Sequence, residues 1–148
     1  MDLAEVRGQL NVEEPDYRAL ARSLGIEAAP HLRALVAGGN QFVAAKAAYL
    51  ASLLPGQAET VTLAARSAHP VVRVAAAGAA ANLTVQERVK PLQDLLDDAD
   101  AGVRKTAVLA ASRLRAGALR PKVEHLEQTD PEAAVRTTAQ KALSHWPV

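Results

Sequence analysis

The residues best suited to chemistry are four histidines and one group of acidic side chains. Histidine serves as a general base or a metal ligand, but the four are scattered, without a second ligand at helical spacing: His31, His69, His125 and His145. The acidic group is Asp94, Asp97, Asp98 and Asp100. Such a group is typical of a solvated helix end and turn. We do not expect a calcium site, because a calcium-binding loop also needs backbone carbonyls as ligands. No zinc-hydrolase, serine-hydrolase or phosphate-loop motif occurs. We therefore expect no enzymatic activity, no cofactor and no metal.

The amino-acid composition excludes several further classes of function. The chain has 148 residues, a net charge of +1 and no cysteine, which excludes disulfides, thiolate catalysis and cysteine-ligated zinc. The near-zero charge provides no overall field for nucleic acid or an anionic membrane. We also expect a cytoplasmic protein without a leader or membrane span, because the longest apolar run, Val74 to Ala81, is far too short. Alanine, the best helix former, occurs 33 times and hints at a GC-rich bacterial genome.

Four stretches of the chain repeat one helical pattern. Each begins at a valine, with intervals of 29, 31 and 32 residues between Val43, Val72, Val103 and Val135. Alanine follows each valine by four residues, at Ala47, Ala76, Ala107 and Ala139. Small or apolar residues recur at offsets seven and eleven, and together these offsets form one face of a helix. A weaker copy begins at Tyr17. The period predicts a stack of helical repeats.

A shorter apolar segment precedes each of these helices. We therefore predict a single domain, 1–148, of ten helices in five antiparallel pairs, with repeats over about residues 1–25, 26–55, 56–83, 84–116 and 117–148. Asn40 and Asp100 are predicted N-caps, and His69 precedes a helix that starts at a proline. Thr84 and Glu87 have the spacing of a capping box. Leu95 and Leu114 are expected in the core.

The segments 89–107 and 126–143 resemble HEAT repeats. In that family a first helix, often bent at a proline, leads through an Asp-containing turn to a second helix with Val-Arg and a later Ala. Prolines match at Pro30, Pro91 and Pro121, and Val-Arg at Val72, Val103 and Val135. Ala44 replaces the arginine in the repeat of Val43. The resemblance implies an all-α fold, a right-handed α-α superhelix of about five antiparallel helix pairs.

The resemblance also implies a role for the arginines at the edge of the core, Arg18, Arg73, Arg104 and Arg136. They would bond aspartates of adjacent turns, such as Asp100 and Asp130, in a ladder along the stack. The alternative is that they bind a ligand directly.

In this architecture the second helices line a concave face. A helical wheel places offsets two, six and nine outermost, which exposes an apolar strip in the middle repeats. Such a strip with a polar rim is typical of protein-binding surfaces. We therefore predict a non-catalytic adaptor that binds a protein or peptide segment through Tyr49, Val74, Gly78, Ala81, Lys105, Leu109 and Ser112. The alternative is that neighbouring helices bury Val74 and Leu109 as ordinary packing.

Nucleic acid is the second candidate partner. Some HEAT-like proteins hold the DNA backbone with a basic concave surface, and the corresponding residues here would be Arg73, Arg104, Lys105, Arg113, Arg136 and Lys141. Aromatic residues make up only 3% of the chain, so a stacking platform for single strands is not expected.

Trp146, the only tryptophan, occupies offset eleven of the last repeat. It either covers the apolar end of the stack or is exposed as a dimer contact. We expect a monomer or a weak homodimer.

Overall fold

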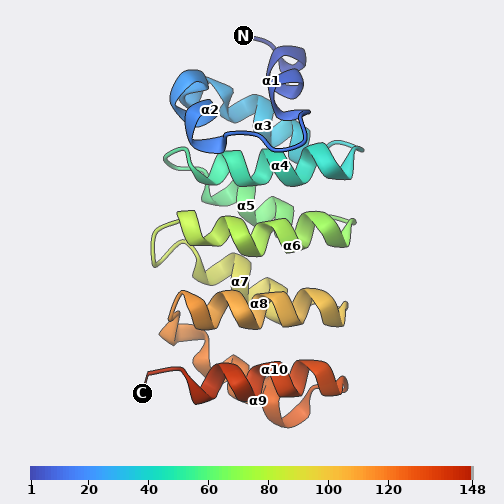
Figure 1. The fold of residues 1–148 in the computed structure, drawn as a ribbon, viewed down its shortest axis with the longest axis vertical. Coiled ribbons are helices and arrows are strands. Elements are labelled where there is room, and N and C mark those ends of the chain that lie inside the picture. The colour runs from blue at the N-terminus through green and yellow to red at the C-terminus, as the bar shows by residue number, and fades with distance from the viewer. Residues whose placement is uncertain (148) are drawn as a thin grey trace.

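The computed structural model describes residues 1–147, which form ten α-helices and three short 3₁₀ turns and contain no strand (Figure 1). The helices are α1 (Leu3–Leu10), α2 (Tyr17–Leu24), α3 (Ala29–Val36), α4 (Gln41–Ser52), α5 (Ala58–Ala65), α6 (Pro70–Ala79), α7 (Val89–Leu96), α8 (Ala101–Arg113), α9 (Arg120–Thr129) and α10 (Ala133–Ser144). The 3₁₀ turns are η1 (Ile26–Ala28), η2 (Ala80–Asn82) and η3 (Gly117–Leu119).

The helices form two layers of an elongated stack. The layer nearer the viewer in Figure 1 contains α4, α6, α8 and α10, each packed against the next, and the layer behind it contains α3, α5, α7 and α9. This is the expected all-helical α-α solenoid. The first two helices depart from the pairing, because α1 packs against α3 and α4, while α2 packs against α4.

The repeated alanines make this close stacking possible. Ala47, Ala76, Ala107 and Ala139 are all fully buried, as the period predicts. A larger side chain at these positions would overpack the interface between neighbouring helices. Leu95 is also fully buried, but the expectation for Leu114 was wrong, because it is only partly buried beside the core. Trp146 is buried in the core, so it is not an exposed dimer contact.

Local capping starts several helices where the sequence predicts. The side chains of Asn40 and Asp100 accept hydrogen bonds from the first turns of α4 and α8. Thr84 and Glu87 form the reciprocal hydrogen bonds of a capping box, but in the turn before α7, whose N-cap residue Arg88 makes no side-chain capping bond. His69 stands at the N-cap of α6, but its side chain makes no capping hydrogen bond.

The C-terminus of α8 ends in a left-handed residue that is not glycine. Arg115 has a φ of 52°, and the amides of Arg115 and Ala116 donate to the carbonyls of Ser112 and Ala111. This is the Schellman pattern, in which glycine usually occupies the left-handed position.

Candidate interaction surface

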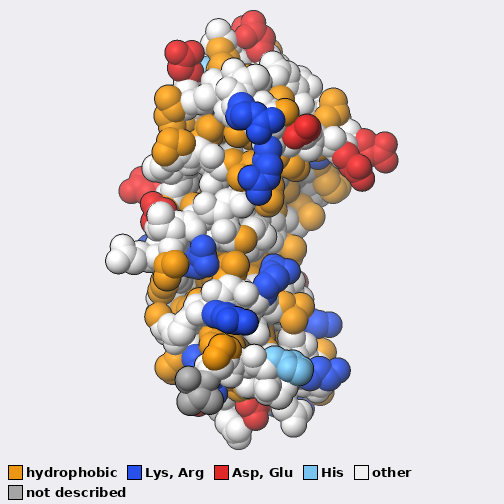
Figure 2. All heavy atoms as spheres, turned by 60° about the vertical axis from the view of Figure 1, so that its left-hand side comes forward, with side chains coloured by type: hydrophobic (Ala, Val, Ile, Leu, Met, Phe, Trp, Pro, Cys, Tyr) orange, Lys and Arg blue, Asp and Glu red, His pale blue; other side chains and the backbone are white. Residues whose placement is uncertain are grey.

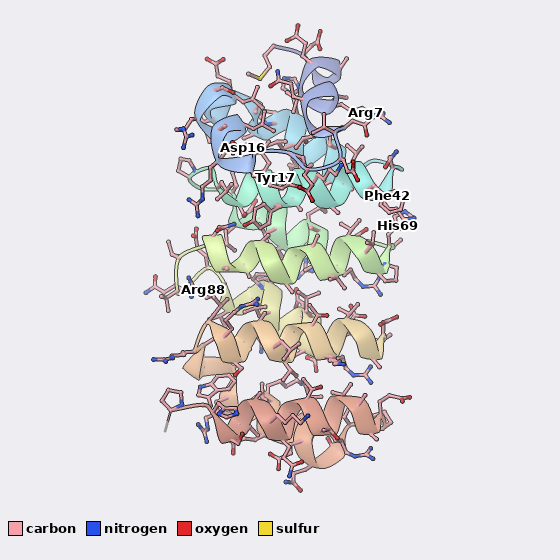
Figure 3. All side chains as sticks on the ribbon, viewed as in Figure 1. Arg7, Asp16, Tyr17, Phe42, His69 and Arg88 are labelled. Atoms are coloured by element: carbon pink, nitrogen blue, oxygen red, sulfur yellow. The ribbon has the colours of Figure 1, made fainter. Side chains whose placement is uncertain are left out.

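We call the surface formed by α2, α4, α6, α8 and α10 the second-helix face. Near its N-terminal end a groove of about 390 Å³ lies over α2, α4 and α6. We call it the tyrosine groove, and it is lined by Tyr17, Ala45, Lys46, Tyr49, Ala75 and Gly78. The Tyr17 and Tyr49 rings meet edge to face with centroids 4.8 Å apart. Figure 3 shows Tyr17 at the level of α4.

Both tyrosines are partly buried. Burial raises the pKa of the Tyr17 hydroxyl, and the nearby Tyr49 adds a smaller increase. The ammonium group of Lys46, on the rim of the groove, donates a hydrogen bond to the backbone carbonyl of Val12. The tyrosine groove is thus a mostly apolar site whose one cation already bonds the N-terminal loop.

Gly78 forms an open part of this groove. A β-carbon built on Gly78 meets no atom within 4 Å. Neighbouring helices therefore do not require glycine here, although glycine within a helix costs about 0.5–1 kcal/mol relative to alanine. The space beside the Gly78 α-carbon is therefore open to the tyrosine groove.

An apolar strip continues from the tyrosine groove along the second-helix face. Val74 is 37% exposed and Leu109 is 49% exposed, and Ala81 is also exposed. The alternative that neighbouring helices bury Val74 and Leu109 is therefore wrong. The strip leaves two branched apolar side chains in solvent, which a bound partner could cover.

A second groove, of about 530 Å³, lies between α8 and α10. We call it the basic groove, and it is lined by Lys105, Leu109, Ser112, Arg113, Thr138, Lys141, Ala142 and His145. Figure 2 shows Lys and Arg side chains gathered with a histidine in the lower half of that view, whereas most acidic side chains lie in the upper half. Three predicted partner-binding residues, Lys105, Leu109 and Ser112, line this groove.

The six arginines and lysines considered for nucleic acid fall into two groups. Arg73 forms an ion pair with Asp98 at 2.8 Å, and Arg104 one with Asp130, also at 2.8 Å. Arg136 donates to the carbonyl of Asp130. The other three, Lys105, Arg113 and Lys141, are exposed and line the basic groove.

The arginine ladder is present: Arg104 bonds Asp130 as expected, but the other ion-paired rung uses a different aspartate. Arg73 bonds Asp98 rather than Asp100, because Asp100 is used as the N-cap of α8. Arg18 makes no side-chain hydrogen bond or ion pair within residues 1–147. Arg73, Arg104 and Arg136 each donate to a carbonyl six residues earlier, at Ser67, Asp98 and Asp130.

The Arg104–Asp130 rung is the most buried, and it perturbs both partners. The Arg104 guanidinium, through its hydrogen bonds, holds the pKa of Asp130 below its usual range, although burial acts in the opposite direction. The same hydrogen bond raises the pKa of Arg104. These arginines therefore tie adjacent turns together.

The acidic group is used in the same structural way. Asp94 pairs with Arg66, Asp97 with Lys122 and Asp98 with Arg73. Across residues 1–147, no group of three or more His, Asp or Glu residues could hold a metal ion.

Sequence reasoning missed Tyr17 and the α10 side of the basic groove. Tyr17 was assigned to the core face of a divergent first repeat, and no spacing signal places it beside Tyr49. Thr138, Ala142 and His145 belong to the basic groove only because α10 packs beside α8.

Phe42 is a further exposed apolar residue, and its side chain is 64% exposed. It lies at the edge of the stack where α4 and α6 begin, the same edge as His69 (Figure 3).

Comparison with known families agrees with this geometry. The family model for HEAT repeats matches residues 58–144, more than half of the chain. The chain belongs to the HEAT-repeat family. HEAT repeats are generally scaffolds for protein interaction. The match covers α5 to α10 and so includes both ion-paired rungs of the ladder and the basic groove except for His145. No curated protein matches the chain.

No helix within residues 1–147 of this HEAT protein has the length and apolar character needed to cross a bilayer.

Proposed function

We propose that this HEAT protein is a non-catalytic interaction module that holds a segment of another protein against its second-helix face. The observation that carries the proposal is the exposed strip of Val74 and Leu109, on the neighbouring helices α6 and α8, with Leu109 also lining the basic groove. Burying such apolar side chains contributes about 25 cal/mol per Å² of area removed from water.

The proposed contact residues remain those expected from the pattern: Tyr49, Val74, Gly78, Ala81, Lys105, Leu109 and Ser112. Tyr17 is added because its ring packs on Tyr49. An aromatic pair in a groove supplies a large, rigid contact area and suits an anchor position. The duplex DNA alternative loses support from Arg73 and Arg104, whose guanidinium groups are occupied by Asp98 and Asp130.

The test compares two variants of the full chain. Val74→Ser with Leu109→Ser removes the exposed strip, and Ile26→Ser with Val85→Ser removes two exposed apolar side chains outside the helices of the second-helix face. Both variants are expected to unfold within a few degrees of the wild type. In affinity capture from a native lysate, proteins retained by the wild type and by the Ile26/Val85 variant should be lost from the Val74/Leu109 variant. Equal retention by all three proteins would rule out this face.

A further inference from the structure

The basic groove contains cations that the fold itself does not use. Within residues 1–147, Lys105, Arg113 and Lys141 enter no ion pair and donate no side-chain hydrogen bond. Arg104 and Arg136, on the same two helices, are by contrast held by the carboxylate and the carbonyl of Asp130. The three free cations therefore differ from the structural ones in what they contact.

No acidic side chain lies on the walls of this groove. The sequences of α8 and α10, AGVRKTAVLAASR and AAVRTTAQKALS, contain neither Asp nor Glu. Cations in the last turn of a helix are favoured by the helix dipole, which accounts for Arg113 and Lys141. It does not account for Lys105, which lies in the first half of α8. Lys105 therefore has neither an acidic partner nor a favourable place in the helix dipole.

The surface between these cations is apolar. Leu109 is half exposed there, and the largely buried Ala142 also lines the groove. A ligand that fits must offer negative charges at the rim and an apolar group over Leu109. The backbone of duplex DNA offers phosphates but no apolar group that would cover a leucine, whereas an acidic amphipathic peptide offers both.

We propose that the basic groove binds an acidic, amphipathic segment of a partner protein. Carboxylates of the segment pair with Lys105, Arg113 and Lys141, and one of its large apolar side chains packs on Leu109 and Ala142. The inference rests on the proposed function, because it assigns the chemistry of the partner at one end of the second-helix face. The tyrosine groove, whose rim lysine is already bonded, receives an uncharged part of the segment.

The experiment selects ligands without assuming their sequence. A library of random peptides displayed on phage is selected on the immobilised full chain, and enriched peptides are synthesised with a fluorescent label. Their dissociation constants are measured by anisotropy at low and at physiological salt. The groove variant carries Lys105→Gln, Arg113→Gln and Lys141→Gln. The matched control carries Arg7→Gln, Arg22→Gln and Lys90→Gln, three exposed residues with the same total change in charge.

Enriched peptides should be rich in Asp or Glu around a Leu, Phe or Trp. Three exposed charge pairs predict a loss of affinity of roughly tenfold in the groove variant and less than about twofold in the control. Salt should weaken binding to the wild type more than binding to the groove variant.

Five results would overturn the inference. Enriched peptides without an acidic bias would do so, and so would equal losses in the two variants. If a short duplex DNA bound more tightly than the peptides and depended on the groove residues, the ligand would be nucleic acid and not a peptide. Peptides insensitive to the three glutamines but lost on Val74→Ser with Leu109→Ser would overturn the inference and preserve the proposed function. Peptides insensitive to both sets would contradict both.

Discussion

Arg104 on α8 joins Asp130, in the turn before α10, by two hydrogen bonds of 2.8 and 3.0 Å from its Nε and Nη2 atoms. Its Nη1 atom donates to the carbonyls of Asp98 and Ala99, at the other end of the rung. The side chains of Arg104 and Asp130 are only 11% and 1% exposed. One arginine thereby fixes the spacing between two successive turns of the stack.

Loss of Arg104 should therefore be costly. Arg104→Ala leaves the Asp130 carboxylate buried without its partner, which predicts a loss of about 3–5 kcal/mol in the free energy of unfolding. Arg136→Ala is the matched control, because Arg136 donates one hydrogen bond to a carbonyl and should cost about 1 kcal/mol. Urea denaturation of the two variants measures the difference. Equal costs would mean that the rung does not couple the repeats.

The same pair predicts the response to acid. The pKa of Asp130 is lower in the folded chain than its unfolded value of about 3.9, so the folded state gains stability when the carboxylate is ionised. That gain is complete above the unfolded pKa and is lost as the pH falls through the folded one. Between neutral pH and pH about 3, the free energy of unfolding should therefore fall more steeply for the wild type than for Asp130→Asn. Parallel curves would contradict the assignment.

Arg115 supplies a prediction in the stabilising direction. Its left-handed backbone strains any residue with a β-carbon, so Arg115→Gly should raise the free energy of unfolding by about 0.5–1 kcal/mol. Arg113→Gly, two residues earlier within α8, should lower it by a similar amount. Thermal unfolding of both variants tests the sign. A destabilising Arg115→Gly would show that the arginine side chain makes a contact stronger than the strain.

The core and the caps could be predicted because their causes are local or periodic. The burial of Ala76 and Ala107 follows from one period, and the cap at Asp100 from its position before a helix. The Arg73 rung uses Asp98 instead of the expected Asp100, two residues away in the same turn. In that turn the amide of Asp100 donates to Asp98 Oδ1, and this geometry aims the carboxylate at Arg73. Spacing alone does not reveal it.

The site was predicted less completely, because each groove depends on distances between helices. The offsets correctly placed Val74 and Leu109 in solvent. They could not bring Tyr17 to Tyr49, since α2 does not follow the repeat that the other second helices share. They did separate Lys105, placed outermost, from the adjacent Arg104, placed at the edge of the core, where it forms a buried ion pair.

Gly78 connects stability to the proposed function. Because α6 leaves open space around it, Gly78→Ala should not clash with any neighbour and should stabilise the chain by about 0.5–1 kcal/mol. The added methyl group projects into the tyrosine groove, so a partner that lies close to the α6 backbone should bind the variant more weakly. Thermal unfolding and the affinity of a captured partner, measured on the same preparations, separate the two effects. Greater stability with weaker binding is the expected outcome, because a glycine that the fold does not need is explained by close approach of a ligand. Greater stability with unchanged affinity would remove Gly78 from the contact surface while leaving Val74 and Leu109 to be tested on their own.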